Sequence, residues 1–151
     1  MADGPCEDLP DVRIVEVGLS QMDVIRSLNE VIFEEERVIN TLERDDLLIL
    51  LAYVGDEPIG FKIGYRESRF VFYSAKGGVL SEYRRCGIAR KLLDEMLRRA
   101  REKGYVRFAF DTFPNRHPGM AVLALTEGFR LTKADYNALY KDYRLRFEKK
   151  L

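Results

Sequence analysis

The chain has 151 residues, 46% hydrophobic and 33% charged, which is the composition of one globular domain with a sizeable core. Its 25 basic and 25 acidic residues cancel, so no global field draws it toward nucleic acid or an anionic membrane. One histidine and two widely separated cysteines argue against a metal site or a serine triad, and we expect Cys6 and Cys86 to be free thiols.

The sequence also contains neither a predicted membrane span nor a predicted signal peptide. The longest apolar run, residues 47–54, is too short to span a bilayer, and the acidic N-terminus lacks the apolar centre of a signal peptide. We therefore expect a flexible tail over residues 1–11, a single domain over residues 12–151 and a cytoplasmic location.

The first elements alternate between strand and helix. Residues 13–17 are predicted to form a strand, and apolar residues at helical spacing predict a helix over residues 21–33, capped by Ser20. The acidic segment 34–46 (EEERVINTLERDD) is expected to be a second short helix or a helical loop.

Three antiparallel strands are predicted next. Residues 47–54 and 59–67 should form a hairpin, because Gly55 and Pro58 bracket a polar turn. Residues 69–80 are rich in aromatic and β-branched side chains and supply the third strand, in which Gly77 and Gly78 indicate a bulge or a close backbone approach.

A long amphipathic helix is predicted from Ile88 to a stop at Gly104. Its expected apolar stripe is Ala89, Leu92, Leu93, Met96 and Ala100, and its expected ion pairs are Asp94 with Arg98 and Glu95 with Arg99.

The last third should contain a strand over residues 106–113, a loop, a short helix over residues 120–127 ended by Gly128, and two terminal strands. A strand that leads into a helix and back into a strand places the two strands parallel. The predicted fold is therefore of the α/β (α+β) class. It has a single mixed, mostly antiparallel sheet that contains one parallel βαβ unit and is flanked by helices.

The junction before the long helix carries the sequence Arg84-Arg85-Cys86-Gly87. A helix N-terminus offers unpaired amide donors and a partial positive charge, so with a glycine and two arginines it is suited to hold a phosphate or pyrophosphate. The segment lacks the ending of a P-loop and the three glycines of a dinucleotide fingerprint, which disfavours ATP and dinucleotides.

In this setting, Arg84-x-x-Gly87-x-Ala89 resembles the acyl-CoA pyrophosphate motif of the GNAT superfamily of N-acyltransferases. The order of elements and the pair Gly128-Phe129 match as well. The resemblance implies acetyl-CoA as co-substrate, with no metal, and pyrophosphate binding by the backbone of Arg84, Arg85, Cys86, Gly87, Ile88, Ala89 and Arg90. It also implies that Val79 and Leu80 pair with the pantetheine arm and supply an oxyanion donor. Asn115 would contact the pantetheine arm or be an ordinary loop residue.

The implied reaction is direct transfer of an acetyl group to an amine. A lysine-like amine, with a pKa near ~10.4, must lose a proton before it attacks, and Glu35 and Asp111 are the candidate bases. In many relatives a tyrosine four residues before the Gly-Phe pair acts as the general acid that protonates the leaving thiolate, and this chain has Ala124 there. Tyr73, Tyr136 or Tyr140 could replace it, or no acid is needed.

Two other classes of function stay open from the sequence. The first is a non-catalytic acyl-CoA-binding or sensing module, which Ala124 and the lack of a clear base suggest. The second is nucleic-acid binding by Arg84, Arg85, Arg98, Arg99 and Arg101, which interleaved acidic residues argue against. The acidic residues Glu34, Glu35, Glu36, Asp45 and Asp46 weakly favour a cationic acceptor. The resemblance also suggests a homodimer, because many relatives pair through their late strands.

Overall fold

The computed structural model describes residues 11–40 and 42–151. A seven-stranded sheet has the order β1-β2-β3-β4-β5-β7-β6. The strands are β1 (Val12–Val17), β2 (Leu48–Val54), β3 (Glu57–Arg66), β4 (Val71–Val79), β5 (Arg107–Thr112), β6 (Arg130–Asn137) and β7 (Asp142–Lys150). The α-helices are α1 (Met22–Phe33), α2 (Ile88–Glu102) and α3 (Pro118–Thr126). Apart from Asp11, the predicted tail lies outside the described residues, as does Cys6.

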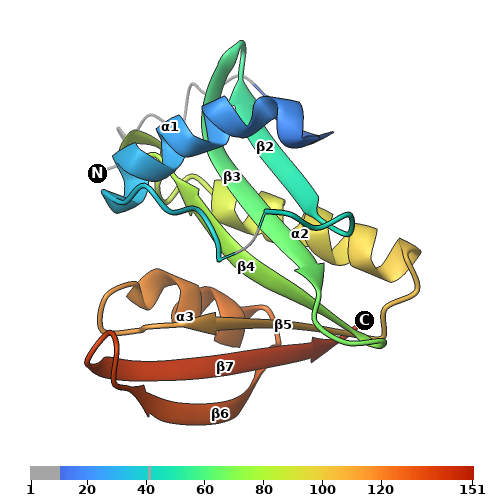
Figure 1. The fold of residues 1–151 in the computed structure, drawn as a ribbon, viewed down its shortest axis with the longest axis vertical. Coiled ribbons are helices and arrows are strands. Elements are labelled where there is room, and N and C mark those ends of the chain that lie inside the picture. The colour runs from blue at the N-terminus through green and yellow to red at the C-terminus, as the bar shows by residue number, and fades with distance from the viewer. Residues whose placement is uncertain (1–10, 41) are drawn as a thin grey trace.

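Two hydrophobic cores cover the two faces of the sheet. In Figure 1, α1 crosses one face of β2, β3 and β4, while α2 lies behind them on the other face. The core under α1 is centred on Ile25, Phe61 and Ile63. The core under α2 also receives Phe110 from β5 and Ala124 from α3, so it joins the two halves of the sheet. The predicted fold class, a mixed sheet flanked by helices, is confirmed.

The one parallel strand pair is short. β4 pairs with β5 over only four residues, from Val71 beside Arg107 to Ser74 beside Phe110. Beyond this point the two strands diverge, and Figure 1 shows them as the arms of a V. A register shift between β3 and β4 leaves Ala75 unpaired at the point of divergence, and such a bulge bends the strand that carries it.

The segment between α1 and β2 differs from its prediction. In residues 34–40 and 42–46 the chain is irregular and not helical. Glu34 adopts a left-handed conformation (φ 57°) that ends α1. The buried Asn29 side chain then donates to the carbonyls of Glu35 (2.7 Å) and Arg37 (3.3 Å). These two hydrogen bonds hold the chain in an irregular conformation, although its local composition favours a helix.

Details of both long helices also needed correction. α1 begins at Met22 without a side-chain cap, so Ser20 is not its N-cap. On α2, Ala89 is exposed, and Ile88 and Leu97 complete the buried stripe. Arg98 binds Glu95 and Glu102, not Asp94, whereas the predicted pair of Glu95 and Arg99 is present at 2.8 Å. Within the described part of the chain, no helix is long and apolar enough to cross a membrane.

Glycines in the central strands allow neighbouring side chains to pack directly against the strand backbone. A Cβ on Gly78 would lie 2.9 Å from side-chain atoms of both Ile32 and Phe33, so the end of α1 packs directly against the strand at this glycine. A Cβ on Gly64 would lie 2.4 Å from the Phe72 ring, which is almost fully buried. Both positions therefore require the absence of a side chain.

We predict that Gly64→Ala lowers the free energy of unfolding by about 1–3 kcal/mol, because the added methyl group overpacks against Phe72. Urea denaturation measures the change. Gly18→Ala is the matched control, since a Cβ at Gly18 meets no atom within 4 Å and its φ of −101° suits alanine. Equal stability of the two variants would contradict the packing argument.

Candidate active site

A cleft of about 900 Å³ opens where β4 and β5 diverge. Its walls come from the end of α1 and the segment after it, the second half of β4, the start of α2, the end of β5 and the start of α3. The sheet thus contributes backbone as well as side chains to the lining, because two adjacent strands separate inside the molecule.

The N-terminus of α2 lies in the wall of this cleft. The first intrahelical bond runs from the amide of Lys91 to the carbonyl of Gly87 (3.1 Å), so the amides of Ile88, Ala89 and Arg90 have no partner within the helix. Gly87, the N-cap residue, has a φ of 78° and open space around it, and it provides no side-chain cap. This end of the helix is built to receive an anion.

Three arginines surround the start of α2. Arg84 donates through Nε to the carbonyl of Val79 (3.4 Å), and Arg90 binds Glu127 (2.9 Å). Arg85 has a positive φ of 63°, which together with Gly87 turns the loop sharply before the helix. All three residues line the cleft, so the local charge is positive although the chain is neutral.

The edge of β4 that faces the cleft begins earlier than expected. The amide of Leu80 donates to Ile59 on β3 (2.8 Å), so it is not available as an oxyanion donor. Because successive backbone groups of a strand alternate in direction, Gly77 and Val79 direct theirs away from β3. The strand edge open to a ligand is therefore that of Gly77 to Val79, not Val79 to Leu80.

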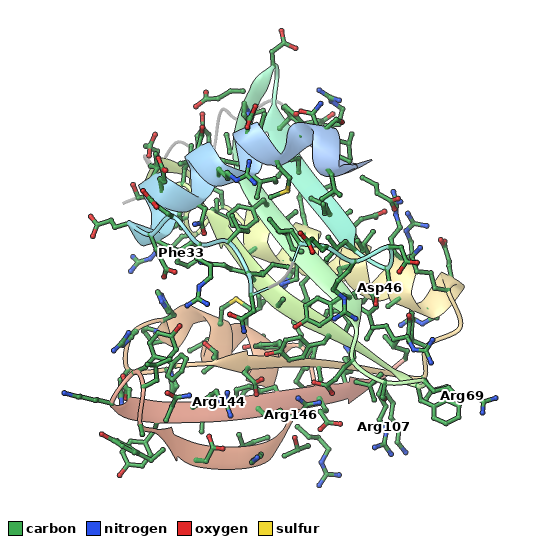
Figure 2. The ribbon with its side chains drawn as sticks, viewed as in Figure 1. Phe33, Asp46, Arg69, Arg107, Arg144 and Arg146 are labelled. Carbon is green, nitrogen blue, oxygen red and sulfur yellow. The ribbon has the colours of Figure 1, made fainter. Side chains whose placement is uncertain are left out.

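A tyrosine and an aspartate meet where β4 and β5 separate. The Tyr73 hydroxyl donates to Oδ2 of Asp111 at 2.6 Å. Burial, followed by this bond to Asp111, raises the pKa of Tyr73 far above its ordinary range. Tyr73 is therefore a poor proton donor to a leaving group, and instead it orients the carboxylate of Asp111. The Arg146 guanidinium lies 5.8 Å from the centre of the Tyr73 ring; Figure 2 shows Arg146 on β7.

The opposite side of the cleft has a second polar group. Glu35 binds Nζ of Lys76 (3.2 Å), and this ammonium lies 4.5 Å from the centre of the Phe33 ring. Figure 2 shows Phe33 at the end of α1. The Phe33 ring also contacts His117 at 5.9 Å. Burial, then the charges of Arg84 and Arg116, lower the pKa of His117, which keeps its imidazole neutral at pH 7.

A buried lysine also lines the cleft. Lys62 on β3 is 5% exposed, and burial lowers its pKa from the ordinary value of 10.5 to about 8. Lys62 is not among the residues predicted for the site, because a lone lysine between apolar neighbours, in GFKIG, gives no local sign of burial. Phe61 and Ile63 face α1, so strand alternation places Lys62 on the opposite face of the sheet, which α2 covers.

The structure brings together most, but not all, of the predicted site. The cleft is lined by Glu35, Tyr73, Val79, Arg84, Arg85, Gly87, Ile88, Ala89, Arg90 and Asp111, and also by Tyr140. It does not include Leu80, Cys86, Asn115 or Tyr136. Asn115 donates to Asp142 (2.9 Å), and Tyr136 packs on Tyr143. Ala124 is fully buried in the core under α2.

The expectation of a free thiol at Cys86 is wrong. Cys86 is disulfide-bonded, and no cysteine among the described residues is free. The expectation relied on the wide separation of the two cysteines in the sequence. Such a separation does not prevent two segments from meeting in the fold. The half-buried Cys86 side chain packs against the core beside the cleft.

The cleft thus combines an open strand edge, an uncapped helix N-terminus and a carboxylate at the point of divergence, an arrangement that could hold an acyl-CoA thioester beside a base. The model of the acetyltransferase (GNAT) family matches residues 20–129, and the chain belongs to this family. The family resemblance proposed from Arg84-x-x-Gly87-x-Ala89 is thus confirmed, and the protein is an enzyme.

Solved structures show the same fold. An IAA acetyltransferase from Bacillus cereus has a TM-score of 0.81 and 19% identity, over 93% of this chain and all of that one. The ribosomal-protein-S18-alanine N-acetyltransferase from Escherichia coli has a TM-score of 0.80 and 12% identity, over 93% and 94%. A GNAT family acetyltransferase from Elizabethkingia anophelis with acetyl-CoA bound has a TM-score of 0.77 and 18% identity, over 93% and 98%. None of the curated proteins matches the sequence significantly.

We predict that Lys62→Met stabilises the protein at pH 7 by up to about 3 kcal/mol, the cost of lowering a pKa from 10.5 to about 8. Between pH 8 and 10.5 the unfolded chain binds a proton that the folded protein does not, so wild-type stability should rise with pH across this range. The advantage of Lys62→Met should therefore shrink over the same range. Urea denaturation at pH 7 and pH 10 measures it.

Lys76→Met is the control for this prediction, because Lys76 lines the same cleft but is paired with Glu35. It should not share the pH-dependent gain. An equal gain for Lys62→Met at pH 7 and at pH 10 would show that the buried charge is not its source.

Proposed function

We propose that the protein transfers an acetyl group from acetyl-CoA directly to a primary amine. The observation that carries the proposal is the N-terminus of α2, whose unpaired amides lie at one end of a cleft that leads to Asp111. Acetyl-CoA has a chemistry that fits this layout, with a pyrophosphate at one end and an amide-containing arm that leads to a thioester.

The donor would bind in two parts. The pyrophosphate would accept hydrogen bonds from the amides of Ile88, Ala89 and Arg90, with Arg84 and Arg85 supplying positive charge. The pantetheine arm would follow the open edge of β4 from Val79 to Gly77, where its amides meet strand backbone groups. This path delivers the thioester to the divergence of β4 and β5.

Asp111 is the preferred base for the acceptor amine. Its carboxylate lies at the point of divergence and is oriented by Tyr73 at 2.6 Å. Glu35, the other candidate, is half-exposed and already paired with Lys76 at 3.2 Å. A primary amine with a pKa near ~10.4 arrives protonated at neutral pH, so a carboxylate within reach would accept the proton directly or through a water.

The nature of the acceptor stays at the level of a primary amine, either small or on a peptide. The acidic residues that favoured a cationic acceptor are partly neutralised by neighbours: Glu35 by Lys76, and Asp46 by Arg44 at 2.7 Å. An amine panel should therefore include small amines, lysine-containing peptides and free peptide N-termini.

We predict that Gly87→Glu weakens CoA and acetyl-CoA binding at least about tenfold, or about 1.4 kcal/mol, because a carboxylate then faces the pyrophosphate. Isothermal titration calorimetry measures both affinities. Gly104→Glu is the matched control: Gly104 also has a positive φ (92°) and open space, but lies beyond the other end of α2. Failure of the wild type to bind CoA would end the acyltransferase proposal.

We predict that Asp111→Asn lowers kcat by about 10²–10⁴, with little change in the KM for acetyl-CoA, because the amide retains the bond to Tyr73 but cannot accept a proton. Steady-state release of CoA with an accepted amine measures both constants. Asp94→Asn, on the exposed face of α2, is the control. Saturable binding of acetyl-CoA with no turnover of any amine would favour the alternative, a sensing module.

A further inference from the structure

Lys62 is a buried cation to which the proposed function gives no role. Its side chain is 5% exposed and lines the cleft. Among the described residues, no hydrogen bond or ion pair involves its Nζ. A buried charge without a partner is costly, so its presence in the wall of a ligand cleft indicates that the ligand provides the partner.

The strand pairing shows how Lys62 reaches the cleft. Lys62 lies opposite Leu50 on β2 and Gly77 on β4. Leu50 belongs to the core under α2, and side chains of directly opposite residues share a face of the sheet, so Lys62 lies on the α2 face. A Cβ on Gly77 would lie 3.2 Å from Cγ of Lys62. The lysine stem therefore passes beneath a glycine, toward the opening between β4 and β5.

This direction brings the ammonium to the part of the cleft expected to hold the sulfur of the thioester. The open backbone edge begins at the same glycine, Gly77, and Phe110 and Leu123 line the cleft beyond it. The neighbouring Ala124, where many relatives have a tyrosine, has no polar atom in its side chain. Ala124 is buried in the core and does not line the cleft, so this position supplies no proton donor, while the Lys62 side chain lines the cleft from β3.

We propose that Lys62 binds the CoA sulfur and protonates it as it leaves, replacing the tyrosine that relatives carry at the position of Ala124. This role rests on the proposed acetyl transfer. The amine nitrogen attacks the thioester carbon and a C–N bond forms. The C–S bond then breaks, its electron pair goes to sulfur, and the sulfur takes a proton from the Lys62 ammonium. Asp111 accepts the proton released by the amine, and solvent restores both groups.

Proton transfer between these partners is well matched. Burial lowers the pKa of Lys62 to about 8, close to the ~8.5 of a thiol, so the lysine is charged at pH 7 and gives up its proton readily. The other titratable or charged side chains that line the cleft are Glu35, Arg37, Tyr65, Tyr73, Lys76, Tyr83, Arg84, Arg85, Arg90, Asp111, Arg116, His117 and Tyr140. The lowering of the Lys62 pKa comes from burial alone and not from these charges.

The first test measures binding rather than turnover. The wild-type protein should lower the pKa of the bound CoA thiol below ~8.5, because the ammonium stabilises the thiolate anion. Ultraviolet absorbance of the thiolate measures this pKa. It should also bind CoA more tightly than desulfo-CoA at pH 8. Lys62→Met and Lys62→Gln should lose both effects, whereas Lys76→Met, in the same cleft, should retain them.

The second test uses an accepted amine. Lys62→Met should lower kcat about 10²-fold with a smaller change in the KM for acetyl-CoA, and wild-type kcat should fall above about pH 8 as Lys62 loses its proton. Unchanged kcat and an unchanged thiol pKa in both Lys62 variants would overturn the role of Lys62 but leave the proposed function intact. Acetylation of Lys62 itself, seen by mass spectrometry, would also overturn it, since Lys62 would then be an acceptor. Absence of CoA binding by the wild type would instead refute the proposed function.

Discussion

The structure depends on a parallel strand pairing that stops after four residues. β4 and β5 are joined from Val71 to Ser74 and then separate, which exposes strand backbone inside the molecule. Unpaired backbone groups in a protein interior are costly unless a ligand satisfies them. A polar arm that lies along the strand would meet this need, which is why we propose the break in the sheet as the binding site.

The elements around this break hold it open. The bulge at Ala75 bends β4, and Gly78 lets the end of α1 lie directly against the strand. On the far side, Arg146 joins β7 to Glu67 after β3 with two hydrogen bonds, one of 2.9 Å, so the closed end of the V is tied across the sheet. The core under α2 continues from one arm to the other through Phe110. The two arms thus share one core on the side of α2, with the cleft between them.

Charged and polar groups occupy three separate parts of the cleft. Arg84, Arg85 and the N-terminus of α2 lie at the end proposed to bind the pyrophosphate, and the pair of Tyr73 and Asp111 lies at the point of divergence. Lys62 enters from the α2 face beneath Gly77. An unpaired buried lysine destabilises the empty protein, which is the usual cost of a preorganised site. In the proposed reaction, stability and chemistry are therefore opposed at Lys62.

Local sequence patterns were enough to predict the order of the strands and the parallel βαβ unit, because periodicity acts over a few residues. They also predict an anion site at the glycine before α2. Only the tertiary structure decided which groups share the cleft. It brought Asp111 to Tyr73 across 38 residues, tied Asn115 to Asp142 away from the cleft, and buried Lys62 between neighbouring strands. Those outcomes depend on contacts between distant segments, which local sequence patterns do not contain.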